Sequence, residues 1–175
     1  AASSWDRAGA GIWEMRGEPQ HHVHSKILCW VALDRATKLA PQLGEFARAD
    51  ECAAERDRIR DEILKRGWSE KRQAYAQAFD SDELDASLLL MPLVGFLPAT
   101  DERMRSTIDA IAGDLTEDEL VLRYRNTEGV NADGLEGEEG TFVICSYWLV
   151  SCLAEAGELE RAEALFERLA GYAND

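Results

Sequence analysis

Residues 24–40, HSKILCWVALDRATKLA, decide the fold of this chain of 175 residues. The apolar side chains of this stretch fall nearly all the way round a helix, which is typical of a helix enclosed on most sides. Residues 51–66, ECAAERDRIRDEILKR, instead carry a narrow apolar stripe on a charged surface, and Gly67 follows as a C-terminal cap. The two segments predict an inner helix followed by an outer helix.

The same order recurs twice farther along the chain. Residues 84–96, LDASLLLMPLVGF, and 141–156, TFVICSYWLVSCLAEA, are almost wholly apolar, and amphipathic stretches follow them at 101–115 and 157–169. Three inner and outer pairs predict an all-α fold, an α/α toroid that forms half of a six-pair ring. We expect residues 1–175 to be one partial domain of this kind, because the chain is too short for two ordinary domains.

The composition is that of a globular protein, with 46% hydrophobic and 30% charged residues. The formal net charge of −15 repels phosphate backbones and anionic lipids, so neither a nucleic acid nor a membrane is expected as a partner. The four cysteines lack the CxxC spacing of a zinc site and are expected to be buried thiols. The sequence opens with no secretory signal and contains no apolar run long enough to span a bilayer, so we expect a cytoplasmic location.

Two long polar connections, 68–83 and 116–140, each join an outer helix to the next inner helix and should lie at the same end of the stack. Acidic residues stand just ahead of two inner helices: Glu14 in GIWEMRG, and Glu136, Glu138 and Glu139 in DGLEGEEGTF. Two carboxyl groups that meet at one end of a toroid can hydrolyse a glycosidic bond. From spacing alone, ordinary capping of helix starts is the better explanation of these residues.

The surroundings of the acidic residues suggest different protonation states. Trp13 precedes Glu14, and its ring can exclude water and raise the carboxyl pKa, as a proton donor requires. Glu139 stands beside a helix N-terminus, whose free N–H groups favour the ionised form that a general base needs. The acidic stretch before residue 140 lacks the D-x-[DN]-x-[DN]-G pattern of a calcium loop.

Three histidines, His21, His22 and His24, lie close together before the first inner helix. A metal site is disfavoured, because adjacent imidazoles on a loop seldom converge on one ion without a partner carboxylate. The preferred role of these histidines is to form hydrogen bonds with sugar hydroxyls or with the chain around Glu14. The alternative is that they are plain surface histidines.

Three stretches carry a resemblance to a known family: 11–40, GIWEMRGEPQHHVHSKILCWVALDRATKLA; 79–101, FDSDELDASLLLMPLVGFLPATD; and 133–150, DGLEGEEGTFVICSYWLV. In the same order, they closely resemble bacterial glycoside hydrolase family 15 proteins, which include glucoamylases and trehalases. The resemblance implies an (α/α)6 catalytic barrel that hydrolyses α-glucosidic bonds with inversion and releases glucose. It implies an α-linked glucosaccharide or trehalose as substrate, and neither a metal nor an organic cofactor.

The resemblance also assigns roles to residues. The glutamate after Ile-Trp matches the general acid of the family, which makes Glu14 the proton donor. The general base lies in a segment read as E-G-x-F, which favours Glu139 over Glu138. The candidates for substrate binding are Trp13, Arg16, His24 and Glu138. In an inverting enzyme the two catalytic carboxyl groups stand about 6.5–9.5 Å apart.

Family members carry further segments before and after the region of resemblance, so both ends of this chain are expected to be incomplete. We therefore expect exposed apolar flanks on the helices at 24–40 and 141–156, through which copies of the chain can self-associate. A non-catalytic helical scaffold, or an inactive fragment of such an enzyme, is the alternative function. The motifs do not separate trehalose from maltooligosaccharides.

Overall fold

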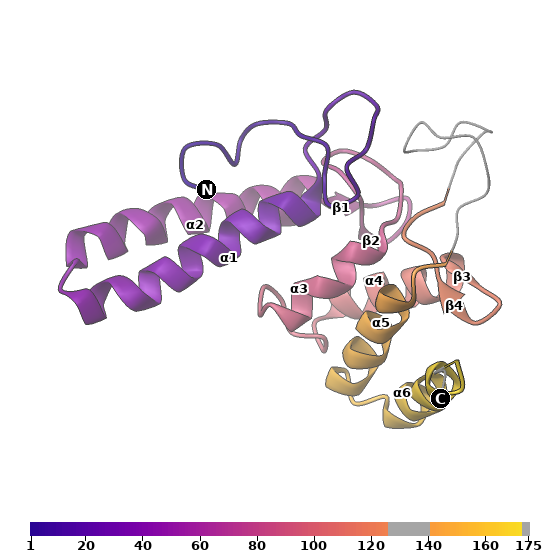
Figure 1. Cartoon of the computed structure of the whole chain (residues 1–175). Helices are drawn as coiled ribbons and strands as arrows, with labels where there is room; N and C mark the ends of the chain where they lie inside the picture. Colours follow the sequence, from indigo (N-terminus) through magenta and orange to yellow (C-terminus); the bar gives the residue numbers. More distant parts are fainter. Residues whose placement is uncertain (126–140, 173–175) are drawn as a thin grey trace.

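The computed structural model describes residues 1–125 and 141–172, and it contains three helix pairs (Figure 1). The first pair is α1 (Val23–Leu39) and α2 (Phe46–Arg66), joined by the 3-10 helix η1 (Ala40–Leu43). The second is η2 (Ala86–Leu89) with α3 (Leu90–Leu93), followed by α4 (Glu102–Asp114), and the third is α5 (Val143–Glu155) with α6 (Leu159–Ala170). The predicted all-α architecture of three inner and outer pairs is confirmed.

Two short antiparallel hairpins lie between the pairs. The first pairs β1 (Trp68–Ser69) with β2 (Ala74–Tyr75), and the second pairs β3 (Thr116–Glu117) with β4 (Leu120–Val121). Each hairpin begins soon after an outer helix ends, within one of the two long connections. These connections are therefore folded segments rather than plain loops.

The second inner element is shorter than the sequence predicts. In place of one helix over 84–96, the structure has a 3-10 turn and a single α-helical turn. Pro92 has no N–H with which to continue the helix, and Gly95, at φ +78°, ends it in a Schellman motif. In this motif the N–H of Phe96 donates to the carbonyl of Met91 (2.9 Å), and the N–H of Gly95 donates to the carbonyl of Pro92 (2.8 Å).

Aspartates cap the N-termini of η2 and α4 in the second pair. Asp85 caps η2, because its side chain accepts a hydrogen bond from the N–H of Ser87 (2.7 Å). Asp101 caps α4 in the same way through the N–H groups of Arg103 (3.0 Å) and Met104 (3.2 Å). Both aspartates thus satisfy helix donors that have no partner within the helix.

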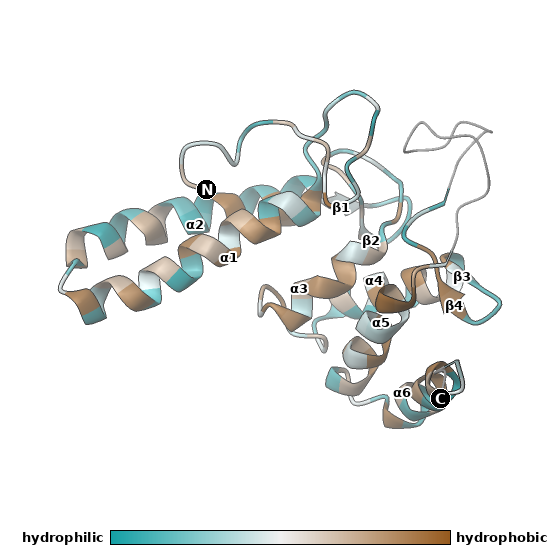
Figure 2. Cartoon of the chain, in the orientation of Figure 1, coloured by the Kyte–Doolittle hydropathy of each residue, from teal (hydrophilic) through white to brown (hydrophobic). Residues whose placement is uncertain are grey.

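The hydrophobic core lies between the inner elements, the hairpins and the inward faces of α2 and α4. Figure 2 shows α5 apolar over most of its surface, whereas hydrophilic residues cover much of α2. Trp30 of α1 meets Phe96 edge to face at 5.0 Å between ring centroids. Fully buried side chains of this core are Ile27, Ile59, Ile63, Leu88, Met91, Met104, Ile108 and Ile111. Each contributes about 1.5–3 kcal/mol by leaving water.

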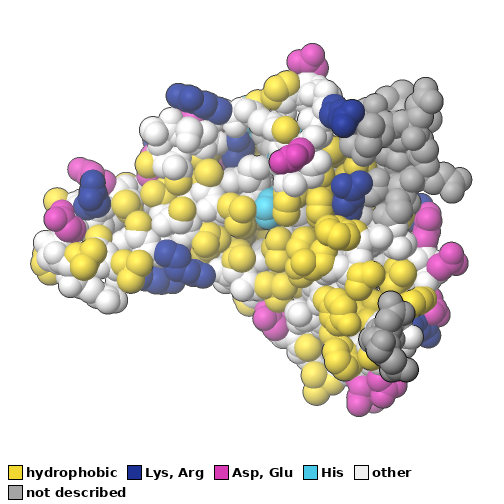
Figure 3. All heavy atoms as spheres, in the orientation of Figure 1, with side chains coloured by type: hydrophobic (Ala, Val, Ile, Leu, Met, Phe, Trp, Pro, Cys, Tyr) yellow, Lys and Arg dark blue, Asp and Glu magenta, His cyan; other side chains and the backbone are white. Residues whose placement is uncertain are grey.

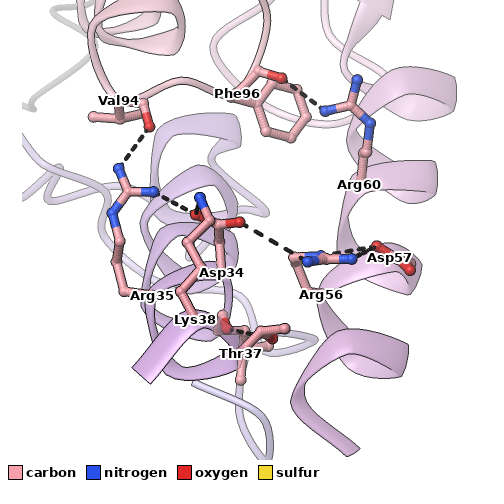
Figure 4. Close-up of polar contacts among 10 residues, drawn as sticks. Asp34, Arg35, Thr37, Lys38, Arg56, Asp57, Arg60, Val94 and Phe96 are labelled. Carbon is pink, nitrogen blue, oxygen red and sulfur yellow. Dashed lines mark hydrogen bonds and ion pairs between the residues drawn. The ribbon is translucent and has the colours of Figure 1, made fainter. Parts of the chain in front are cut away.

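A buried carboxylate anchors the first pair near the C-terminal end of α1 (Figure 4). Asp34 is 5% exposed and accepts a hydrogen bond from Lys38 (2.7 Å) and one from Arg35. Arg56 of α2 approaches the second oxygen of Asp34 to 3.9 Å. Burial favours a higher pKa for Asp34, but the hydrogen bonds and charges of Lys38 and Arg35 outweigh it, and the pKa lies below its ordinary value.

The same region ties the first pair to the second. Arg35 of α1 donates to the carbonyl of Val94 (3.0 Å), and Arg60 of α2 donates to the carbonyl of Phe96 (2.7 Å) (Figure 4). The guanidinium of Arg60 also lies 5.0 Å from the ring centroid of Phe96. Two cations therefore donate hydrogen bonds to carbonyl groups that follow the C-terminus of α3 and have no partner within the helix.

At the opposite end, backbone hydrogen bonds link the start of each of the first two inner elements to a later connection. The N–H of Val23, the first residue of α1, donates to the carbonyl of Gln77 (2.9 Å). In the same way, the N–H of Ala86 in η2 donates to the carbonyl of Arg123 (2.8 Å). The described parts of both connections therefore gather at this end, as predicted (Figure 1).

Apolar side chains stay exposed on two inner helices, and this confirms the expected exposed flanks. Figure 3 shows hydrophobic side chains gathered around α5 and along α1. Large side chains more than a third exposed at these helices are Leu28, Leu39, Phe142, Val143, Ile144 and Tyr147. Within the described ranges, no helix combines the length and the apolar character needed to cross a bilayer.

Candidate active site

The loop before α1 presents Trp13 and Glu14 at the end of the molecule where the connections gather. Two backbone hydrogen bonds between Gly9 and Gln20 (2.9 and 3.0 Å) close this loop. Inside it, the N–H of Met15 donates to the carbonyl of Ala10 (2.8 Å), and the Met15 side chain is buried. The loop is therefore a closed turn with one residue fixed in the core.

Glu14 occupies the tip of this turn. Its side chain is exposed, and its backbone has φ +52°, in the left-handed region that non-glycine residues rarely adopt. Such a conformation costs about 1–2 kcal/mol and persists only where the surroundings fix it. The residues on either side of Glu14 therefore determine where its carboxyl group lies.

Trp13 is fixed through both its N–H group and its ring. The indole N–H donates to the two carboxylate oxygens of Asp85, at 2.9 and 3.1 Å. Phe142 meets the ring edge-on at 6.0 Å between centroids, and Trp148 lies tilted at 6.3 Å. Arg123 lies over the ring, with its guanidinium carbon 5.5 Å from the centroid.

The expectation that Trp13 shields Glu14 from water does not match the described residues. Glu14 is exposed, and the Trp13 ring contacts Phe142 and Trp148 while its N–H binds Asp85. Arg16, another predicted binding residue, is also exposed. The structure thus brings Trp13 and Glu14 to one surface with an aromatic wall beside them.

Asp85 is a site residue that sequence reasoning missed. It is 3% exposed and accepts hydrogen bonds from Trp13, from the side-chain amide of Gln77 (3.1 Å) and from its own helix turn. The sequence signal was an aspartate just ahead of an apolar run, which predicts a helix cap. Nothing local indicates that the same carboxylate reaches an indole 72 residues away.

The histidine cluster divides into one peripheral and two buried side chains. His22 and His24 are 5% and 4% exposed, so the interpretation as plain surface histidines is wrong for both. Burial lowers their pKa values below 6.5, and the charge of Asp85 partly opposes this effect. Both imidazoles are therefore neutral at pH 7. His21 stacks on Phe79 at 6.0 Å between ring centroids.

Gly11 leaves room for one of these imidazoles. A Cβ atom at this position would lie 2.9 Å from the ring of His22, and the backbone there has φ +72°. Only glycine satisfies both conditions without strain. The loop that carries Glu14 is consequently packed directly on the buried histidines.

The remaining predicted site residues lie outside the described residues. These are Glu136, Glu138 and Glu139, so the choice of base and the distance between acid and base stay predictions. Among residues 1–125 and 141–172, no group of three or more His, Cys, Asp or Glu side chains is placed to hold a metal ion.

Comparison with curated proteins gives trehalases as relatives. The trehalase of Mycolicibacterium smegmatis is 54% identical over 174 residues, and that of Mycobacterium tuberculosis is 52% identical. A trehalase of Thermoplasma volcanium is 34% identical over 171 residues. The matches cover 97–99% of this chain but only 25–27% of the relatives. The chain therefore spans a small part of the length of these proteins.

Solved structures share the fold. A structure described as a wild-type glycosidase matches 99% of this chain and 44% of its own, with a TM-score of 0.80 and 23% identity. A glucoamylase from Saccharomycopsis fibuligera matches 85% of this chain and 35% of its own, with a TM-score of 0.67 and 13% identity. The half-barrel arrangement of the helix pairs agrees with both. The sequence model of glycosyl hydrolases family 15 matches residues 1–174, and this chain belongs to that family.

Proposed function

We propose that the protein containing this chain is a trehalase-like glycoside hydrolase that cleaves an α-glucosidic bond with inversion of the anomeric carbon. The observation that carries the proposal is the position of Glu14 at the exposed tip of a closed turn, in a chain that the family model matches over residues 1–174. The identity of 52–54% to two trehalases favours trehalose over maltooligosaccharides as the substrate.

In the proposed mechanism, Glu14 is the general acid and Glu139 the general base. Glu14 donates its proton to the glycosidic oxygen while the bond from that oxygen to the anomeric carbon breaks. Glu139 removes a proton from a water molecule, whose oxygen attacks the anomeric carbon from the opposite face. The products are β-glucose and the released sugar, and no metal or organic cofactor takes part.

The proposed substrate-binding roles are supported in part by the positions of the described residues. Trp13 and Phe142 offer aromatic surface beside Glu14, and sugar rings pack well on such faces. His24, whose neutral imidazole is 4% exposed, is kept as a proposed binding residue because of the family resemblance. Arg16 and Glu138 stay in the proposal as further binding residues.

The test is proton NMR of the full-length protein with trehalose and, separately, maltotriose. Inversion predicts that the first glucose released from maltotriose is the β-anomer. It also predicts that trehalose gives α- and β-glucose in equal initial amounts, because the leaving glucose keeps its α configuration. Glu14→Gln and Glu139→Gln should each lower kcat by about 100-fold or more, since each keeps the shape and removes the acid or base. Glu18→Gln, at an exposed glutamate of the same segment, is the matched control and should keep wild-type kcat. Initial release of α-glucose from maltotriose, or of α-glucose alone from trehalose, would contradict inversion.

The alternative is a non-catalytic helical scaffold. A scaffold should tolerate Glu14→Gln with no loss of function, so the same variants separate the two interpretations. The cytoplasmic location stays a prediction, which cell fractionation of the native host tests.

A further inference from the structure

We propose that Asp85 is a positioning residue that holds the Trp13 indole and thereby fixes Glu14 at the tip of its turn. The inference rests on the proposed role of Glu14 as general acid. Asp85 itself acts through Trp13 and is not proposed to touch the substrate.

The carboxylate of Asp85 collects donors from three separate segments. Trp13 comes from the loop before α1, Gln77 from the connection after β2, and Ser87 from the first turn of η2. Oδ1 accepts from Ser87, Oδ2 accepts from Gln77, and the indole N–H lies between both oxygens. At 3% exposure, such a group is stable only when its oxygens are satisfied. The rotamer of Asp85 is therefore fixed by Ser87 and Gln77 independently of Trp13.

Glu14 stands between two anchors. On one side Met15 is buried, and on the other the Trp13 indole is bound to Asp85. Phe142, Trp148 and Arg123 contact the ring of Trp13, whereas Asp85 is the partner of its N–H group. The hydrogen bond to a charged acceptor is directional and fixes the remaining orientation.

The left-handed backbone of Glu14 makes the second anchor necessary. Since this conformation is disfavoured, the turn relaxes when one of its flanking residues is released. A displacement of about 1 Å of a catalytic group can lower the rate about 100-fold. Loss of the Asp85 anchor should therefore appear mainly in kcat.

Asp85→Asn is the sharpest variant. The amide oxygen in the place of Oδ1 can still cap η2 and stays 3.1 Å from the Trp13 N–H. The amide nitrogen in the place of Oδ2 removes the shorter contact with Trp13 and the acceptor of Gln77, and the loss of charge weakens the contact that is left. Asp101→Asn is the matched control, because both helix donors of α4 bind one oxygen of Asp101, which asparagine keeps.

The full-length protein is assayed on the substrate that releases glucose. We expect Asp85→Asn to lower kcat about 30- to 100-fold, with KM changed less than about threefold, while Asp101→Asn stays within about twofold of wild type. In a Trp13→Phe background, which lacks the indole donor, Asp85→Asn should lower kcat by less than about threefold, because coupled residues are not additive. An unchanged kcat in Asp85→Asn, or an equal loss in both backgrounds, would overturn the inference.

A second readout does not depend on activity. The indole N–H signal of Trp13 is assigned in a ¹⁵N–¹H spectrum by its absence in Trp13→Phe. It should move upfield in Asp85→Asn and stay in place in Asp101→Asn. A signal that does not move in Asp85→Asn contradicts the contact.

If Asp85→Asn does not fold, Gln77→Met takes its place, because it removes one donor to Asp85. This variant should lower kcat several-fold, and a wild-type kcat in Gln77→Met refutes the positioning role of Asp85.

The two proposals fail in different ways. If Glu14→Gln keeps full activity, the proposed function is wrong. If Glu14→Gln is inactive while Asp85→Asn is fully active, only the role of Asp85 is wrong.

Discussion

Acidification should destabilise this fold through two buried histidines. His22 and His24 have pKa values lowered by burial, whereas in the unfolded chain they titrate near the ordinary value of 6.5. Below pH 6.5 the unfolded state therefore binds protons that the folded state does not, and the free energy of unfolding falls with pH. The fall ends at the folded-state pKa values, below which both states are protonated. A histidine that stays neutral in the folded state over this range contributes at most about 1 kcal/mol between pH 6.5 and 5.5, so the pair contributes at most about 2 kcal/mol.

The assay is urea unfolding followed by tryptophan fluorescence at pH steps from 7.5 to 5.5. Carboxyl groups with ordinary pKa values titrate below this range, so the slope reports on the histidines. His24→Gln should remove about half of the pH dependence, whereas His21→Gln should remove less, because His21 is the least buried of the three. A free energy of unfolding that stays constant over this range, or a slope that His24→Gln leaves unchanged, would refute the reasoning.

Three further predictions concern the loop, the core and the surface. Gly11→Ala should lower the free energy of unfolding by about 2 kcal/mol or more, because the new Cβ meets the His22 ring and the backbone at this position is left-handed. Thermal unfolding measures this loss, and an unchanged Tm would contradict the packing of Gly11 on His22. Arg60→Met should cost about 1–2 kcal/mol by leaving the Phe96 carbonyl without this donor, and an equal midpoint in urea would argue against the contact. Ile144→Lys should raise the concentration at which copies of residues 1–175 self-associate, because it places a charge on an exposed apolar helix. Sedimentation velocity measures this, and an unchanged concentration would show that α5 is not the surface through which copies associate.

Periodicity predicted most of the helices but not where all of them begin and end. Five of the six expected helices are present near their predicted ranges, because the apolar pattern of a helix is local. The segment 84–96 was the exception, since Pro92 and Gly95 divide an apolar run whose hydropathy alone resembles that of a buried helix. The start of α2 at Phe46 instead of Glu51 was missed because the first turn carries little apolar patterning.

The site was less predictable than the fold. Glu14 and Trp13 were identified from the motif around them, and the structure places both at the end where the connections meet. The left-handed backbone of Glu14 and the bond from Trp13 to Asp85 depend on tertiary contacts, which a local pattern does not encode. His22 was expected near Glu14, but its burial follows from the close approach of Gly11.

The backbone links from Val23 to Gln77 and from Ala86 to Arg123 fix the part of each connection that adjoins an inner element. The turns between β1 and β2 and between β3 and β4 lie outside these links, at positions 70–73 and 118–119. Insertions there can lengthen a connection while the inner helices keep their register. Such turns offer evolution, or a protein engineer, positions at which the length of a connection can change while the loop that carries Glu14 stays in place.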